Sequence, residues 1–126
     1  MDLIAEYLVT VREISDINHA DFGNKETVKT NNGLADELRA IASEINIEYP
    51  EMKSDFYQLL FHDNPDVRLC AAHHILEVMN FGDECRARAL QEIKYVSAFD
   101  KSINGLGNKM WLEQWFAQHP EDANLL

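Results

Sequence analysis

The chain has 126 residues, 46% of them hydrophobic, and its 22 acidic and 11 basic side chains give a formal net charge of −11. This length and composition are those of a single globular domain with a proper core. No stretch reaches the ~18 apolar residues that a transmembrane helix needs, and no basic segment of the kind that opens a signal peptide follows Met1. We therefore expect a cytoplasmic protein with no membrane partner.

The negative charge is concentrated in the first half of the chain. Residues 1–66 hold 14 acids and 5 bases, whereas residues 67–126 hold 8 acids and 6 bases. Nucleic-acid binding depends on basic side chains, so we expect no nucleic-acid partner. An acidic surface is well suited to attract a basic protein. The simpler interpretation, that acidity only keeps the protein soluble, stays open.

Two amphipathic helices are predicted before Pro50. The first covers residues 2–20, and Gly23 is placed to end it with a left-handed cap. The second runs from about residue 25 to residue 47, with a run of weak helix formers at residues 31–33 that predicts a kink or a break.

The turn over residues 62–66 carries the clearest signal for the start of a helix. Asn64 or Asp63 can accept a hydrogen bond from the free N–H groups of the new helix. Pro65 then occupies the first helical position, where its missing N–H costs nothing, and Asp66 places a negative charge in the first turn.

Helical periodicity predicts four helices after Pro50, over residues 51–61, 65–79, 83–97 and 103–117. Gly82 is expected to cap the second of these and Asp83 to cap the third. Gly105 and Gly107 weaken the first turns of the last helix and allow close packing against a neighbour. Residues 118–126 are expected to form a loose tail. The apolar members of the last helix are Ile103, Leu106, Met110, Trp111, Trp115 and Phe116. No strand alternation is present, so the predicted class is all-α.

The segment Asn64-Pro65-x-Val67-Arg68-x-x-Ala71 resembles the inner turn of a HEAT-type helical repeat. Residues 50–117, with the runs 71–76 and 109–115, resemble a family of small bacterial HEAT-like proteins of unassigned function. This resemblance implies a HEAT/armadillo-like α-α superhelix of about six helices over residues 1–126. Residues 1–48 would cap two hairpins, 51–79 and 83–117. It also implies that Arg68 pairs with an acid of an adjoining turn, Asp63 or Asp100.

Metal binding and catalysis are the chemical alternatives. Cys70 and His74 lie four residues apart on one predicted helix face, and Cys85 with His73 or His62 could complete a zinc site. No Cys-x-x-Cys pair is present, however, and a packed repeat already explains a small buried cysteine. The serines lack a nucleophile-elbow context, and no glycine loop precedes a helix to hold phosphate. We therefore expect reduced thiols, no cofactor, no metal and no enzymatic activity.

The best candidate for a binding site is acidic. Residues 36–66 hold eight acids and two bases. A step of ~100° per residue places Glu37, Glu44 and Glu48 along one edge of the second helix, beside its apolar stripe. Trp111 and Trp115 lie four residues apart, so one is expected in the core and the other is expected to be an exposed anchor. The predicted partner-binding residues are Glu37, Glu44, Glu48, Glu51, Asp55, Asp63, Asp66 and Trp111.

Relatives of the resembled family are often encoded beside polymorphic toxins and look like immunity proteins. This resemblance and the acidic stripe lead to the hypothesis of a bacterial immunity protein, as in contact-dependent inhibition. It would occlude a cognate basic toxin, a nuclease, with carboxylates that mimic phosphate charge. The alternative is a non-inhibitory scaffold or adaptor that holds its partner through apolar groups such as Trp111 or Trp115.

Overall fold

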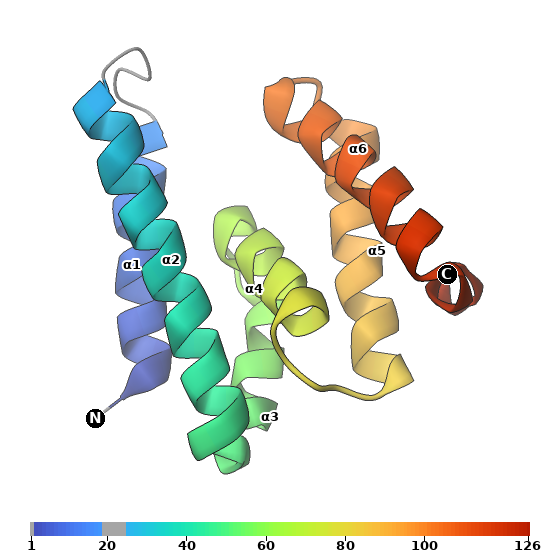
Figure 1. Ribbon diagram of the computed structural model, residues 1–126, viewed down its shortest axis with the longest axis horizontal. Coiled ribbons are helices and arrows are strands. Elements are labelled where there is room, and N and C mark those ends of the chain that lie inside the picture. The colour runs from blue at the N-terminus through green and yellow to red at the C-terminus, as the bar shows by residue number, and fades with distance from the viewer. Residues whose placement is uncertain (1, 19–24) are drawn as a thin grey trace. The chain divides into compact units, whose positions relative to one another are not determined.

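A computed structural model describes residues 2–18 and 25–126 of the chain. Within these ranges the secondary structure consists of six α-helices and three 3₁₀ helices, and no strand is present (Figure 1). The predicted all-α class is therefore confirmed for the described residues. The chain divides into two compact units, Met1–Gln58 and Leu59–Leu126. The division falls inside the hairpin expected over residues 51–79.

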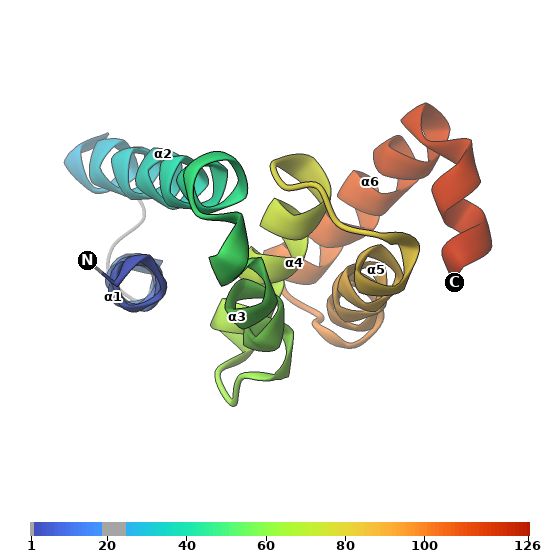
Figure 2. The ribbon, with the colours of Figure 1, turned by 90° about the horizontal axis from the view of Figure 1, so that it is seen from below.

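The N-terminal unit is built on two long helices that lie side by side, α1 (Leu3–Asn18) and α2 (Lys25–Glu48), as Figures 1 and 2 both show. Two short helices follow, η1 (Pro50–Met52) and α3 (Lys53–Tyr57). The two long helices present apolar side chains at helical spacing, and Phe56 adds an edge-to-face ring contact with Tyr7 at a centroid distance of 4.9 Å. Among the residues that the structure describes, the other buried apolar members of this core are Leu3, Val11, Leu38, Ile41, Ala42 and Ile45.

The structure contradicts the expected break in the second helix and the expected single helix over residues 51–61. Helix α2 has no break at residues 31–33, because each weak helix former costs at most ~1 kcal/mol and the packing of Leu38 and Ile45 downstream offsets that cost. The single helix expected over residues 51–61 is instead a 3₁₀, α and 3₁₀ succession. The predicted cap at Gly23 lies outside the described residues.

The C-terminal unit begins inside η2 (Gln58–Phe61), at Leu59. It contains α4 (Pro65–Glu77), α5 (Asp83–Phe99), α6 (Ile103–Gln118) and η3 (Pro120–Leu125). Helix α5 is the common neighbour, because it packs against both α4 and α6 (Figure 2). The core consists largely of small and branched side chains, which allow the helices to approach closely. Its fully buried members include Ala71, Ala72, Ile75, Ala89, Leu90 and Ile93.

The turn before α4 is formed as expected, and of the two candidates for the N-cap of this helix, Asn64 and Asp63, the structure shows one. The side-chain oxygen of Asn64 accepts a hydrogen bond from the backbone N–H of Asp66 at 2.9 Å, so Asn64 is the cap. The prediction for the next turn is wrong. Gly82 does not end α4 in a left-handed conformation; its φ is −74° and it is the N-cap residue of α5, whose first residue is Asp83.

Arg68 binds a different acid from the two predicted. Its Nε lies 3.0 Å from Oε1 of Glu92, and its Nη1 donates to the backbone oxygens of His62 and Asp63 at 2.7 and 3.1 Å. The packing of α5 against α4 places Glu92 beside Arg68, whereas the carboxylate of Asp100 accepts hydrogen bonds from Ser102 and Asn104. Arg68 therefore joins α4 to α5 and to the turn before it.

The C-terminal segment is folded, contrary to the expectation of a loose tail. It forms η3, and the buried carboxylate of Asp122 accepts a hydrogen bond from Trp115 Nε1 at 2.9 Å and forms an ion pair with Arg86. Three elements, α5, α6 and η3, are joined at this one carboxylate.

Helix α6 presents the opposite face to the core from the one its apolar residues suggest. Ile103, Leu106 and Met110 are exposed, Ile103 at 88%, whereas Gly105, Asn108 and Leu112 are buried. Gly105 is required because a Cβ atom there would lie 1.7 Å from the backbone oxygen of Asp100. The expected close packing at a glycine is thus confirmed for Gly105, whereas a Cβ at Gly107 would meet no atom within 4 Å.

We predict opposite effects of alanine at the two glycines of α6. Gly105→Ala should destabilise the protein by about 1–3 kcal/mol, because the methyl group forces α6 away from Asp100. Gly107→Ala should stabilise it by about 0.5–1 kcal/mol through helix propensity alone. Urea unfolding of both variants measures the difference, and equal effects would contradict the inferred contact.

We also predict that the C-terminal segment contributes to stability through Asp122. Asp122→Ala should cost about 2–4 kcal/mol, because it leaves Arg86 and the Trp115 N–H without their partner in a largely buried site. The matched control is Glu121→Ala at the exposed neighbouring position, which should change stability by less than about 0.5 kcal/mol. A loose tail would make both changes silent in thermal unfolding.

Candidate functional site

The N-terminal unit carries an acidic surface, which we define by Glu37, Glu44, Glu48, Glu51 and Asp55. All five side chains are exposed. The first three share one flank of α2, as predicted, since α2 directs Leu38, Ile41 and Ile45 into the core and the glutamates stand beside that stripe. Along the helix axis, Glu37 and Glu44 are about 10 Å apart and Glu44 and Glu48 about 6 Å apart.

The bases of the same region lie off this flank of α2. Arg39 follows Glu37 by two residues, which turns it by ~200° around the helix. Lys53 is half-buried in α3, between Glu51 and Asp55 in the sequence. Along α2, therefore, no basic residue lies between the three glutamates of the acidic surface on their flank of the helix.

Asp63 and Asp66, which were predicted to extend this surface, belong to the C-terminal unit. They flank the turn before α4, where both are exposed. Their backbone groups build the turn, since the Asp63 carbonyl accepts from Arg68 and the Asp66 N–H donates to Asn64. The single predicted acidic region is thus composed of two groups, one in each unit.

Trp111 is held in a polar and aromatic network rather than exposed as an anchor. It is half-buried, its Nε1 donates to Glu77 at 3.1 Å, and its ring packs edge-on against His73 at 4.5 Å. Trp115 stacks on it at 4.9 Å and is also half-buried, so neither tryptophan is the exposed one that was expected. The network ties α4 to α6.

His73 is placed between two acceptors within this network. Its Nε2 lies 2.7 Å from the side-chain oxygen of Asn108, and its Nδ1 lies 3.3 Å from the Glu77 carboxylate. The amide nitrogen of Asn108 donates to the Asn104 carbonyl, which leaves its oxygen as the acceptor for His73. These contacts satisfy a buried polar residue of α6 and explain why Asn108 can face the core.

A second set of exposed side chains, missed from the sequence, lies on α5, on α6 and in the turn between them. We call it the apolar–lysine surface and define it by the exposed residues Tyr95, Phe99, Ile103, Leu106 and Met110, with Lys94, Lys101 and Lys109. Residues 94–110 contain these three lysines and a single acid, Asp100. This segment therefore carries a net charge of +2 in a chain whose net charge is −11.

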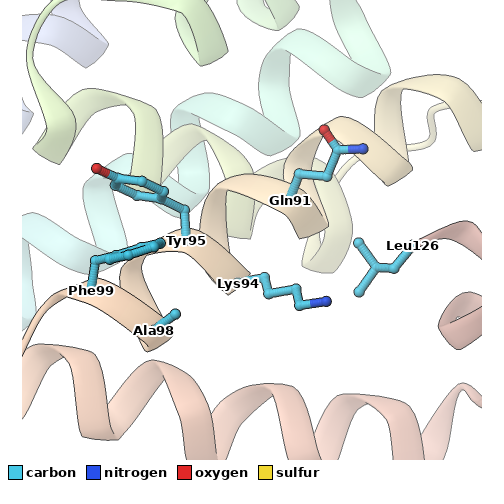
Figure 3. Close-up of a pocket in the computed structure, with 6 residues that line it drawn as sticks. All are labelled: Gln91, Lys94, Tyr95, Ala98, Phe99 and Leu126. Carbon is cyan, nitrogen blue, oxygen red and sulfur yellow. The ribbon is translucent and has the colours of Figure 1, made fainter.

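This surface includes a shallow groove of about 340 Å³ beside α5 (Figure 3). The rings of Tyr95 and Phe99 lie together on one side of it, 4.8 Å apart, and Lys94 extends between them and Leu126. Gln91 and Ala98 complete the lining. The 103, 106, 110 spacing on α6 is that of a core stripe, which is why the sequence concealed this surface. The residue that could have indicated the exposure of this stripe is Gly105, because a glycine allows close packing of the opposite face of α6.

Neither cysteine is in a disulfide, and the surroundings of Cys70 suit a structural thiol. Burial raises the pKa of Cys70 from 9.0 to about 11, and the negative charge of Asp66 adds to the rise. Metals and electrophiles react with the thiolate, which these surroundings disfavour. Throughout the described ranges, no three His, Cys, Asp or Glu side chains are grouped to hold a metal ion.

Comparison with known proteins does not assign a function to this chain, so the assignment depends on the chemistry of the two surfaces. No protein-family model, curated protein or solved structure matches the chain. Among the helices that the structure describes, none has the length and apolarity to cross a bilayer.

We predict that Cys70 is nearly inert in the folded protein. In the Cys85→Ser variant Cys70 is the only thiol, and its raised pKa lowers the thiolate fraction at pH 8 about 100-fold. Labelling with a thiol-disulfide reagent should therefore be at least about 100-fold slower in the folded chain than in guanidinium chloride. Equal rates in the two conditions would show that the site is open and its thiolate accessible.

Proposed function

We propose that this protein is an immunity protein that neutralises a cognate basic toxin domain, a nuclease, by stoichiometric occlusion. The observation that carries the proposal is the exposure of all five carboxylates of the acidic surface on one unit. A nuclease must present basic side chains to bind phosphate, so a surface of this kind is complementary to the groove that it would block.

The proposed mechanism uses charge in two ways. At a distance, the acidic surface steers the basic domain and raises the association rate. In the complex, carboxylates that are only solvated in the free protein become desolvated beside lysine or arginine. Truncation of such a buried partner typically costs ~2–5 kcal/mol, whereas exposed pairs contribute only ~0.2–1 kcal/mol. A few residues, foremost Glu44 and Glu48 near the end of α2, would then dominate the affinity.

We further propose that the fold is a HEAT/armadillo-like superhelix, with residues 1–48 capping repeat hairpins. Two features support this: the Asn64–Pro65 start of α4, and the successive packing of α4, α5 and α6. Repeats of this kind form binding surfaces and are not usually catalytic, which agrees with the proposed role of a cytoplasmic inhibitor that is not an enzyme.

The second candidate is a non-inhibitory scaffold. It is favoured by the apolar–lysine surface, whose apolar members are exposed far more than a core stripe should be. A contact made mainly by these groups should persist at high salt, where a contact made by the acidic surface weakens.

We predict that charge reversal on α2 abolishes protection. The protein encoded immediately upstream is co-expressed in a sensitive strain with this chain, with Glu44→Lys/Glu48→Lys, or with Glu13→Lys/Asp16→Lys. The last variant changes the charge equally at exposed positions of α1 in the same unit. We expect rescue by the wild type and the α1 variant, and a loss of about 100-fold or more in affinity for the α2 variant.

Two results would count against the occlusion mechanism. One is unchanged affinity and salt dependence after reversal of the acidic surface. The other is toxicity of the upstream protein without rescue by the wild-type chain, which would favour the scaffold function.

A further inference from the structure

We propose that copies of this chain associate head to tail, with the end of α2 of one copy docked on the apolar–lysine surface of another. In this contact Ile47 enters the groove beside α5, and Glu44 and Glu48 approach Lys94 in its lining. The inference does not depend on the proposed function, because it concerns the protein without a toxin.

The groove selects an apolar side chain accompanied by negative charge. Its lining is largely apolar, from Tyr95, Phe99, Ala98 and Leu126, and its charged member is Lys94 (Figure 3). A volume of about 340 Å³ is at the lower end of the ~300–1,000 Å³ typical of ligand pockets, which suits one or two side chains.

The rest of the surface extends this preference. Ile103, Leu106 and Met110 are exposed on α6, the helix that follows α5, and the exposed Lys101 and Lys109 belong to the same stretch of sequence. The single acid of this segment, Asp100, has its carboxylate occupied by hydrogen bonds from Ser102 and Asn104. A partner with both apolar and acidic side chains would thus be favoured, and a basic partner repelled.

The end of α2 has this combination. Ile47 is 68% exposed, and the exposed Glu44 precedes it by three residues, on the same side of the helix. Glu48 follows at once, and the exposed Tyr49 and Glu51 continue the apolar and acidic pattern into η1. An apolar side chain flanked by carboxylates is the complement of an apolar groove that contains a lysine.

A second copy is favoured over an anionic membrane by the charge of the whole chain. Exposed aromatic residues and lysines also occur on proteins that bind lipid surfaces. A chain with a net charge of −11, however, is repelled by an anionic leaflet, whereas a second copy supplies acids and an apolar side chain at one place. The same net charge opposes association between copies at long range, so the contact should form only at high protein concentration and moderate salt.

Head-to-tail geometry has a distinctive consequence. The two docking surfaces are different, so a bound pair retains one unused surface of each kind, the groove on one copy and the α2 end on the other, and assembly can continue beyond two copies. Blocking the α2 end in one variant and the groove in another should give chains that are monomeric alone but pair in a mixture, through the intact surface of each.

The test is sedimentation equilibrium of the 14.5 kDa chain up to about 1 mM protein in ~0.1 M salt. Ile47→Asp blocks the α2 end, and Lys94→Glu/Phe99→Asp blocks the groove. Val9→Asp changes another exposed apolar residue, on α1, and is the matched control. Circular dichroism and thermal unfolding of each variant establish that it remains folded.

We expect the average mass of the wild type and of Val9→Asp to rise with concentration. Ile47→Asp and the groove variant should each associate at least about tenfold more weakly, and their equimolar mixture should form a 1:1 complex that does not grow. A wild type that stays monomeric throughout overturns the proposal, as does equal weakening by Val9→Asp and Ile47→Asp. Binding of the monomer to phosphatidylserine vesicles, lost in the groove variant, would assign the surface to a membrane and also overturn it.

Discussion

The close approach of Gly105 to the backbone oxygen of Asp100 is the constraint on which the C-terminal unit depends. Hydrogen bonds from Ser102 and Asn104 to the Asp100 carboxylate lower the pKa of Asp100 and keep it ionised, so it anchors the start of α6. Together these contacts set the rotation of α6 about its axis. Once Gly105 faces inward, Asn108 and Leu112 must follow it at helical spacing, and the apolar residues of α6 are turned toward solvent.

The rotation of α6 explains the two polar clusters of the C-terminal unit. Asn108 can be buried because His73 and the Asn104 carbonyl satisfy its amide, and the Trp111 N–H reaches Glu77 of α4. Beyond them, the buried carboxylate of Asp122 binds Arg86 and Trp115 and holds η3 against α5 and α6. Polar groups that would destabilise the core if left alone are thus paired across helices.

The chain separates its exposed chemistry between its two units. The N-terminal unit presents carboxylates along α2, and the C-terminal unit presents apolar side chains with lysines along α5 and α6. A sequence can reveal the first kind of surface, because the polar flank of an amphipathic helix is almost always solvated. It conceals the second kind, because Ile103, Leu106 and Met110 have the spacing of a buried stripe. Trp111 is the opposite case: it was expected to be exposed, but it is half-buried. The partner of its indole N–H, Glu77, lies on a different helix, so no local pattern in the sequence indicates the contact.

Local patterns alone determined the helical class, the start of α4 at Pro65 with its cap near Asn64, and the exposed carboxylates of α2, because each depends on residues within one or two turns. Only the tertiary structure decided the partner of Arg68, the ordering of residues 120–125, and which face of α6 is buried. Glu92 lies on α5, and Asp122 is bound by Arg86 of α5 and Trp115 of α6. The sequence carries no local record of which helix packs beside which. The rotation of a helix about its axis is set by contacts across elements, and its composition alone does not specify that rotation.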